Sequence, residues 1–277
     1  MQQYDFITAD TLITTAKAEA ISSTSSSITA LQDEQLLAKV HQLNAEWINA
    51  AHISPLGGWS WMQRIYNFKS VAHTTLNGAT SANAATFVLT SASDFDSSGR
   101  VAIETSKNAI DFVDYSSKST NTLTVSTATG AETLEIAHSS GDRVEKMYAL
   151  PSDYSKAKYL YINGVQYDYE RLDGWPIGFT TYGNYTLLPR GIGACDCTLS
   201  YFKKGTTIDK LTGTTDIPSI FERWAVEKLK AHIYLIRRKR ADVPTALQLA
   251  QEALSYAIAH DSQQISNSEA SRLELPY

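Results

Sequence analysis

The stretch Lys158-Tyr-Leu-Tyr-Ile-Asn-Gly-Val-Gln-Tyr-Asp-Tyr-Glu-Arg171 contains the strongest hairpin signal in the chain. Asn163-Gly164 supplies two residues that accept the positive φ angles of a type I′ turn. Apolar and aromatic residues flank this turn on both sides. We therefore predict two antiparallel strands, Lys158–Val165 and Gln166–Arg171, joined at this point.

A series of short strand patterns lies upstream of this hairpin. Apolar residues alternate at Val101/Ile103 and at Leu123/Val125, and turn residues separate the segments at about ten-residue spacing. This spacing is typical of a compact all-β module, which we place at residues 77–147 as an insertion. The other predicted strands are Phe87–Leu89, Arg100–Glu104, Ile110–Tyr115, Thr122–Val125, Thr133–Ile136, Arg143–Met147, Asn184–Leu188 and Asp196–Phe202.

Helical periodicity appears on both sides of the strand-rich part. A first helix is predicted over residues 33–51, followed by the segment Trp59-Ser-Trp61, which we expect to pack on the core. Asp216-Ile-Pro218 predicts the start of a second helix with Asp216 as its cap, and Asp242-Val-Pro244 predicts a third. The predicted apolar faces are Leu36, Val40, Leu43 and Trp47; Phe221, Trp224, Ala225, Leu229, His232 and Ile236; and Leu247, Ala250, Leu254 and Ile258.

These patterns predict an α+β fold, namely a small helical bundle with an inserted compact β module and additional β-hairpins. Residues 33–76 and 148–260 would form the helical core with its hairpins. Residues 1–32 are Ser-rich and poor in large apolar groups, so we expect an N-terminal arm. Residues 261–277 are mostly polar, and we expect an extended C-terminal tail that packs on nothing in the monomer.

Composition excludes several classes of protein. The chain has 277 residues, a net charge of −5 and 43% hydrophobic residues, enough apolar material for a packed core. The acidic balance argues against sequence-independent nucleic-acid binding, which needs a basic surface. No apolar run approaches the roughly 20 residues of a membrane span, and we expect no signal peptide. The chain's 2 cysteines are too few for a disulfide framework.

No segment makes a convincing active or metal site. Cys195-Asp-Cys197 would place two thiols on one strand face, but zinc needs about four ligands, so we expect two small buried side chains. The segment Asp94-Phe-Asp96-Ser-Ser-Gly99 begins like a calcium loop, yet Thr105 stands where that loop needs Glu. We expect a turn there, and a core histidine at His232.

Carboxylates in the strand-rich part do not single out a catalytic pair by their spacing. We therefore predict no enzyme, no metal and no cofactor. The one basic run, Arg237-Arg-Lys-Arg240, has two interpretations: cations stabilised at a helix C-terminus, or contact with DNA phosphates or an acidic partner surface. The carboxylates considered are Asp94, Asp96, Glu104, Asp111 and Asp114.

The second half of the chain resembles the head–tail connector, or adaptor, proteins of tailed bacteriophages. Four motifs that recur there in this order carry the resemblance: Tyr148-Ala-Leu-Pro-Ser-Asp-Tyr154, Tyr161-Ile-Asn-Gly-Val-Gln-Tyr167, Leu199-Ser-Tyr-Phe-Lys-Lys204 and Thr215-Asp-Ile-Pro218. Residues 94–144 look like a small β module common in phage virion proteins. The resemblance covers most of residues 33–260.

This resemblance implies a connector-type helical bundle and a structural role in the virion. A ring of about twelve copies would lie below the portal protein, extend the DNA channel and offer a docking surface to a tail or nozzle protein. Its place would be the head–tail interface, after assembly in the host bacterial cytoplasm, with no membrane contact and passive contact with packaged DNA. Leu273, Leu275, Pro276 and Tyr277 would bind the portal; Arg237, Arg238, Lys239 and Arg240 would contact channel DNA or an adjacent subunit.

Two alternatives stay open at this point. The first is another tail or baseplate component that carries the same β module. The second is a carbohydrate-active virion enzyme, which would need two convergent carboxylates.

Overall fold

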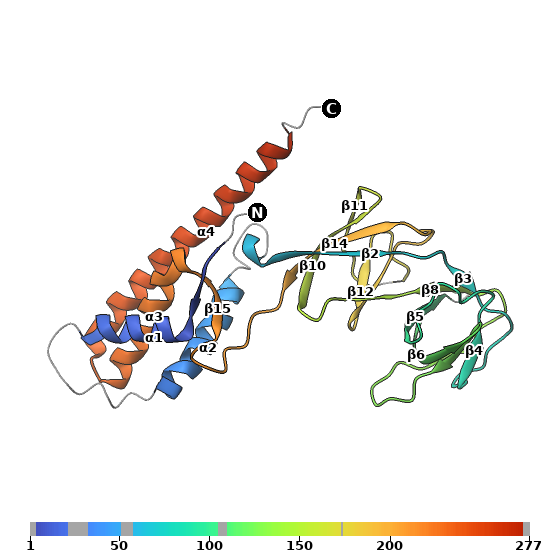
Figure 1. Ribbon diagram of the computed structural model, residues 1–277, viewed down its shortest axis with the longest axis horizontal. Helices are drawn as coiled ribbons and strands as arrows, with labels where there is room; N and C mark the ends of the chain where they lie inside the picture. Colours follow the sequence, from blue (N-terminus) through green and yellow to red (C-terminus); the bar gives the residue numbers. More distant parts are fainter. Residues whose placement is uncertain (1–3, 22–32, 51–57, 105–109, 173, 274–277) are drawn as a thin grey trace. The chain divides into compact units, whose positions relative to one another are not determined.

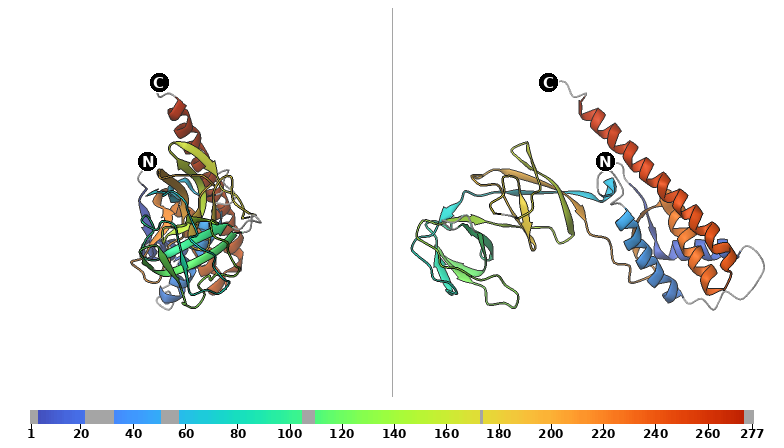
Figure 2. Two further views of the ribbon diagram at one scale, coloured as in Figure 1. Left: turned by 90° about the vertical axis from the view of Figure 1, so that its right-hand side faces the viewer. Right: turned by 180° about the vertical axis from the view of Figure 1, so that it is seen from behind.

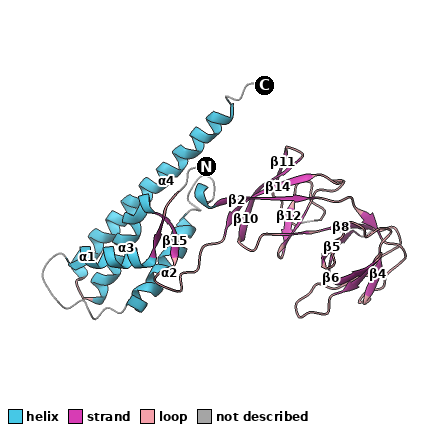
Figure 3. Cartoon of the chain, in the orientation of Figure 1, coloured by secondary structure: helices cyan, strands magenta, loops and turns pink. Residues whose placement is uncertain are grey.

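A computed structural model describes residues 4–21, 33–50, 58–104, 110–172 and 174–273. Its described residues contain four α-helices and fifteen strands, and the chain divides into two compact units. The helical unit comprises residues 1–63 and 203–277, and the β unit comprises residues 64–202. Figures 1 and 3 show the helices gathered in the first unit and most strands in the second.

Helix α3 is the central element of the helical unit. It packs on α1, α2 and α4, and it forms an antiparallel helical hairpin with α4 (Figure 2). The strands β1 and β15 pair as a short antiparallel ribbon. The elements of this unit are β1 (Phe6–Thr8), α1 (Ala9–Ile21), α2 (Asp33–Ala50), η3 (Ser60–Met62), β15 (Thr214–Pro218), η4 (Ser219–Phe221), α3 (Glu222–Ile236), η5 (Arg240–Asp242) and α4 (Val243–Leu273).

Tryptophan rings occupy the middle of this unit's core. Trp47 of α2 stacks on Trp59, with ring centroids 4.7 Å apart, and lies 4.9 Å from Trp224 of α3. Trp61 stacks on the other side of the group, 4.8 Å from Trp59. These contacts confirm that the Trp-rich segment packs on the core, and α2 confirms the helix predicted from residue 33.

The N-terminal arm predicted over residues 1–32 is wrong for residues 6–21, which form β1 and α1. Helix α1 buries Leu12, Ile13 and Ala16 against the unit and packs mainly on α3. Much of this buried face is alanine, which is the best helix former. Small alanine side chains let α1 approach its neighbours closely, so the helix packs on the unit with few large apolar residues. Residues 22–32 of the predicted arm lie outside the described residues.

The extended tail predicted over residues 261–277 is also wrong as far as Leu273, because helix α4 continues to that residue. The stretch 261–272 is polar but contains neither Gly nor Pro. A helix already nucleated by packed turns propagates through such residues at little cost, so polarity alone was a poor sign of an unfolded segment. Residues 274–277 lie outside the described residues.

Three sheets build the β unit. Their strand orders are β11-β10-β14-β2, β12-β13-β9 and β3-β8-β5-β6-β7-β4. Strands β2 and β14, through which the chain enters and leaves this unit, are neighbours in the first sheet. The strands are β2 (Gln63–Lys69), β3 (Thr74–Thr75), β4 (Thr86–Val88), β5 (Gly99–Glu104), β6 (Ile110–Ser119), β7 (Thr122–Val125), β8 (Arg143–Lys146), β9 (Tyr148–Ala149), β10 (Tyr154–Ile162), β11 (Val165–Asp168), β12 (Thr180–Tyr182), β13 (Tyr185–Leu187) and β14 (Asp196–Lys203).

The six-stranded sheet curls into a half-barrel around its own apolar core. A register shift between Tyr115 and Ser117 of β6 marks an irregularity of the kind that increases local twist. Just beyond the end strands β3 and β4, Leu76 and Leu89 form an antiparallel bridge, so the two ends of the sheet meet there. The core cluster contains Leu76, Phe87, Leu89, Ala92, Phe95, Val101, Ile103, Val113, Tyr115, Leu123, Val125, Leu134 and Val144.

One strand of this module was predicted wrongly. Thr133–Ile136 is not a strand, because side-chain carboxylates replace a ladder partner: Glu132 N–H donates to Asp114 at 2.9 Å and Glu135 N–H to Asp111 at 3.1 Å. The other predicted strands are found, and the hairpin β10–β11 turns at Asn163 and Gly164 with φ angles of 48° and 81°.

The predicted fold class, a small helical bundle, is wrong. The protein is a mixed α/β structure and mostly β. Helical patterns extend over many residues and are easy to detect, whereas each strand of the β unit is short. The prediction of the fold class therefore gave the helices too much weight. The chain divides between the two units after residue 63 and before residue 203, so the hairpins belong to the same unit as the half-barrel and not to the helical core, as the predicted boundaries had it.

Candidate functional site

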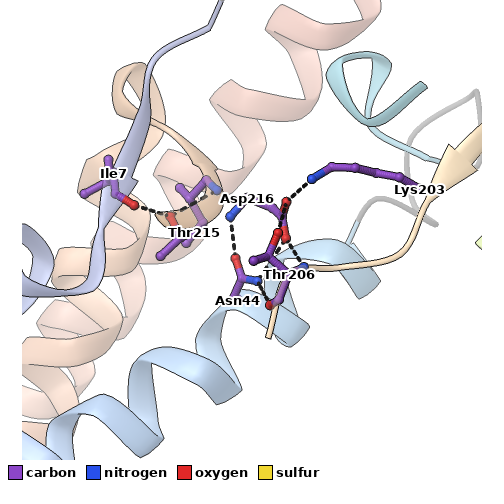
Figure 4. A network of polar contacts seen from close by, with 7 residues as sticks. Ile7, Asn44, Lys203, Thr206, Thr215 and Asp216 are labelled. Atoms are coloured by element: carbon purple, nitrogen blue, oxygen red, sulfur yellow. Dashed lines mark hydrogen bonds and ion pairs between the residues drawn. The ribbon is translucent and has the colours of Figure 1, made fainter. Parts of the chain in front are cut away.

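A buried polar network fixes the strand that leads into α3 (Figure 4). Asp216 of β15 accepts hydrogen bonds from Lys203 Nζ at 2.5 Å and from Asn44 Nδ2 at 3.1 Å. Thr206 adds bonds from its N–H and its hydroxyl, at 2.5 and 2.9 Å. The neighbouring Thr215 hydroxyl donates to the carbonyl of Ile7 in β1 at 2.9 Å. Helix α2, β1 and β15 are thereby held together.

The network corrects the prediction that Asp216 caps the second helix. Asp216 is buried in β15, and α3 begins later, at Glu222. Neither η4 nor α3 has a side-chain cap hydrogen bond. The Asp-x-Pro pattern resembles a helix start, but the long-range partner Asn44 cannot be read from local sequence.

The predicted basic residues 237–240 are brought together in one tight turn between α3 and α4, which we call the basic turn. Three backbone hydrogen bonds close it: Arg237 N–H to Ile233 O at 3.0 Å, Arg238 N–H to Leu235 O at 3.1 Å, and Lys239 N–H to Tyr234 O at 2.9 Å. Arg238 has a φ of 58°, the left-handed conformation that ends a helix. Backbone carbonyl groups therefore accept the N–H groups of this turn, and the cationic side chains are not needed to close it.

Charge in the basic turn is only partly compensated. The side chains of Arg238 and Arg240 are exposed. Within the described ranges, no carboxylate forms an ion pair with Arg238, Lys239 or Arg240. The α3 macrodipole favours cations at this end, but it is worth only a few tenths to about 1 kcal/mol and does not require four of them. The macrodipole therefore accounts for only part of this concentration of positive charge.

At the other end of α3 lies a hollow that sequence reasoning missed, which we call the η4 groove. Its volume is about 340 Å³. Ile220 and Tyr256 remain 54% and 63% exposed within it. An apolar pattern shows which residues share a helix face but not where a neighbouring element stops covering that face. The groove is lined by Ile220, Phe221, Arg223, Leu249, Glu252, Ala253 and Tyr256.

Acidic side chains surround this groove. A second hollow shares Ile220 and Arg223 with it and adds Glu19, Glu222 and Glu227. Lys230 pairs with Glu19 and Glu227, both at 3.0 Å. In the described part of the chain, no cation pairs with Glu222 or Glu252. Two of the four carboxylates near Ile220, Glu222 and Glu252, therefore have no cationic partner in the described structure, and Arg223 is the one cation that lines both hollows.

Among the predicted portal-binding residues, Leu273 is the last residue of α4. The other three, Leu275, Pro276 and Tyr277, lie outside the described residues. Asp261 is the last buried residue described on α4, and its Oδ1 accepts the Ser60 N–H at 3.2 Å. The helix continues for more than three turns after Asp261.

The carboxylates considered for catalysis are engaged separately. Asp114 binds Arg100 through two hydrogen bonds of 2.7 Å, and Glu104 forms an ion pair with Arg190. Asp111 lies 3.0 Å from His138 Nε2, and both side chains are buried. These contacts tie strands and loops of the β unit together.

The calcium-like loop is bridged by an ammonium group of the protein itself. Lys146 Nζ lies 2.8 Å from the Asp96 carboxylate and donates to the Asp94 carbonyl at 3.3 Å. The Lys146 ammonium group therefore occupies the position beside the Asp94 and Asp96 oxygens where a divalent cation would bind. Within the residues described, no three His, Cys, Asp or Glu side chains are grouped as a metal site.

Both cysteines are free thiols; Cys197 is buried as expected, but Cys195 is only half-buried, so the prediction of two buried side chains is wrong for Cys195. Burial, followed by the nearby Cys195, raises the pKa of Cys197 to about 12, so it is neutral at physiological pH. Burial also lowers the pKa of the half-buried His232 on α3, with a smaller contribution from Lys39. A neutral, buried thiol lacks the thiolate character of a reactive cysteine.

Comparisons with known proteins add no assignment. No protein-family model matches the sequence, and no curated protein matches it significantly. Over the ranges that the structure describes, no helix combines the length and the apolar character of a membrane span.

Proposed function

We propose that this protein is a structural virion component, a head-to-tail adaptor that forms a ring below the portal, extends the DNA channel and provides the docking surface for the tail. The ordered motifs between residues 148 and 218 support this proposal through their resemblance to connector proteins. A role in assembly also suits a chain whose unusual features are surfaces: the basic turn, the η4 groove and the end of α4.

The observation that carries the proposal is the length of α4. This helix has 31 residues and α3 has 15, which correspond to about 46 and 22 Å of helix. The last three turns of α4 follow Asp261, and Figure 1 shows this end of the helix running past the other elements of the helical unit. A helix end that runs past the other elements of its unit can bind in a groove of a partner. In the resembling family the C-terminal segment docks on the portal.

The direct test is a truncation after Gln263, measured by co-sedimentation with purified portal protein. The full chain should sediment with the portal, and the truncated chain should not. The truncation keeps Asp261 and all five tryptophans, so its fluorescence and circular dichroism should show an intact helical unit. Portal binding by the truncated chain would contradict the assigned role of this segment.

Negative-stain imaging of the full chain with portal gives the second readout. A ring attached to the portal supports the adaptor. A chain that ignores portal but binds tail or baseplate proteins would instead support the alternative of a tail-side structural component. A chain recovered in neither kind of particle would contradict a virion role.

A further inference from the structure

The basic turn and the η4 groove lie at opposite ends of helix α3. The groove surrounds η4 and the first residues of α3, and the basic turn follows its last residue, Ile236. The 15 residues between them form a rigid rod of about 22 Å. The two surfaces therefore cannot meet each other within one molecule.

The two surfaces are complementary in charge. The basic turn carries four cations, and in the described structure no carboxylate pairs with Arg238, Lys239 or Arg240. Glu252 lines the groove and Glu222 lines the second hollow beside it, and neither pairs with a cation among the described residues. Arg223 is the one cation that lines both hollows. Carboxylates thus outnumber the cation Arg223 along the two adjoining hollows, which makes this surface complementary in net charge to the basic turn.

The two surfaces also match in their apolar parts. Leu235 and Ile236, directly before the basic turn, are 54% and 44% exposed. Ile220 and Tyr256 are the exposed apolar side chains of the groove. A hydrophobic centre inside a charged rim is the usual anatomy of a protein interface.

A second copy of the chain explains both surfaces at once. DNA would neutralise the basic turn, but it would leave Leu235 and Ile236 exposed to water and would leave the η4 groove without a partner. A contact between two different surfaces of identical chains is heterologous, and it closes into a ring when the rotation per subunit permits.

We propose that the basic turn of one copy docks into the η4 groove of the next copy, with Leu235 and Ile236 against Ile220 and Tyr256, and Arg238 and Arg240 beside Glu222 and Glu252. This inference rests on the proposed function, since it supplies the subunit contact of the proposed ring. It assigns the basic residues to an adjacent subunit and not to DNA.

The test is charge reversal in the full-length chain, with self-association measured by sedimentation velocity over a range of concentrations at low salt. R238E/R240E and E222K/E252K should each weaken self-association, on the order of 10- to 100-fold in the dissociation constant. The chain with all four changes should recover most of the loss, because the charges are again opposite. Added salt should weaken the wild-type contact, since the charged rim is exposed to solvent.

Two matched variants control for net charge. K204E/K210E and E34K/D209K reverse exposed residues of the same unit and should leave self-association unchanged. Circular dichroism of every variant should match the wild type, which separates a lost contact from a lost fold.

The outcomes separate this inference from the proposed function. A wild-type chain that stays monomeric at every concentration, or reversed variants that associate as well as the wild type, would overturn the inference while portal binding could still establish the adaptor. Loss of DNA binding in R238E/R240E with unchanged self-association would assign the basic turn to nucleic acid and also overturn it. Rescue by the fourfold variant, in a protein that does not bind portal, would support the contact and contradict the adaptor.

Discussion

At the scale of single residues, Asp216 links stability to pH. Burial acts to raise its pKa, but hydrogen bonds from Lys203, the Thr206 N–H and Asn44 outweigh burial, so the pKa lies below its usual value. A carboxyl group with a depressed pKa stabilises the folded state above its unfolded pKa of about 3.9. That contribution is lost as pH falls through the folded pKa.

We expect Asp216→Ala to lower the free energy of unfolding by about 3 kcal/mol at neutral pH, because it leaves a partly buried Lys203 without its partner. The free energy of unfolding of the wild type should decrease as pH falls below about 4, and that of Asp216→Asn should change less over the same range. Urea titrations at several pH values, followed by tryptophan fluorescence, measure both. Parallel pH profiles for the wild type and Asp216→Asn would disprove the assignment.

At Arg100, in contrast, we expect the geometry of the side chain to contribute more to stability than its charge. Its guanidinium binds Asp114 through two hydrogen bonds of 2.7 Å and lies 5.3 and 5.1 Å from the ring centroids of Tyr182 and Tyr185. Lysine keeps the charge but loses the planar fork and the stacking. Arg100→Lys should therefore lower the free energy of unfolding of the β unit by about 2 kcal/mol. A change below a few tenths of a kcal/mol in urea unfolding would show that charge alone suffices.

At the scale of elements, the β10–β11 hairpin depends on the backbone at Gly164. Its φ is +81°, and a Cβ added there would meet no atom within 4 Å, so any cost of Gly164→Ala is conformational. We expect a loss of about 1 kcal/mol. Gly193 also has open space but lacks a left-handed φ, so Gly193→Ala should be neutral or slightly stabilising. Equal effects of the two substitutions on thermal unfolding would contradict this reasoning.

The elements also show what the sequence could predict. The helix at residues 33–50 and the hairpin at Asn163-Gly164 were predictable because period and turn chemistry are local. Helix α1 was missed because its buried face is largely alanine, and the end of α4 because polar residues hide a continuing helix. The basic turn was visible as a charge run, whereas the η4 groove depends on where α4 stops covering Ile220.

At the scale of the whole molecule, each unit contains its own core, so we expect two separable unfolding transitions. Of the five tryptophans, only Trp175 belongs to the β unit. Trp175→Phe should remove the fluorescence change of one transition and keep the change of the other. A single transition, lost or shifted as a whole in this variant, would show that the units unfold together.

The adjacency of β2 and β14 in one sheet has a consequence for the history of such chains. Strands that are sheet neighbours lie about 4.8 Å apart, so the polypeptide enters and leaves the β unit at nearly one point. A segment with such closely spaced ends can be exchanged by recombination as a cassette while its host helices stay joined across the same short gap. The residues 64–202 should accordingly fold as an isolated fragment, and genes that encode similar helices could carry a different insert at this position.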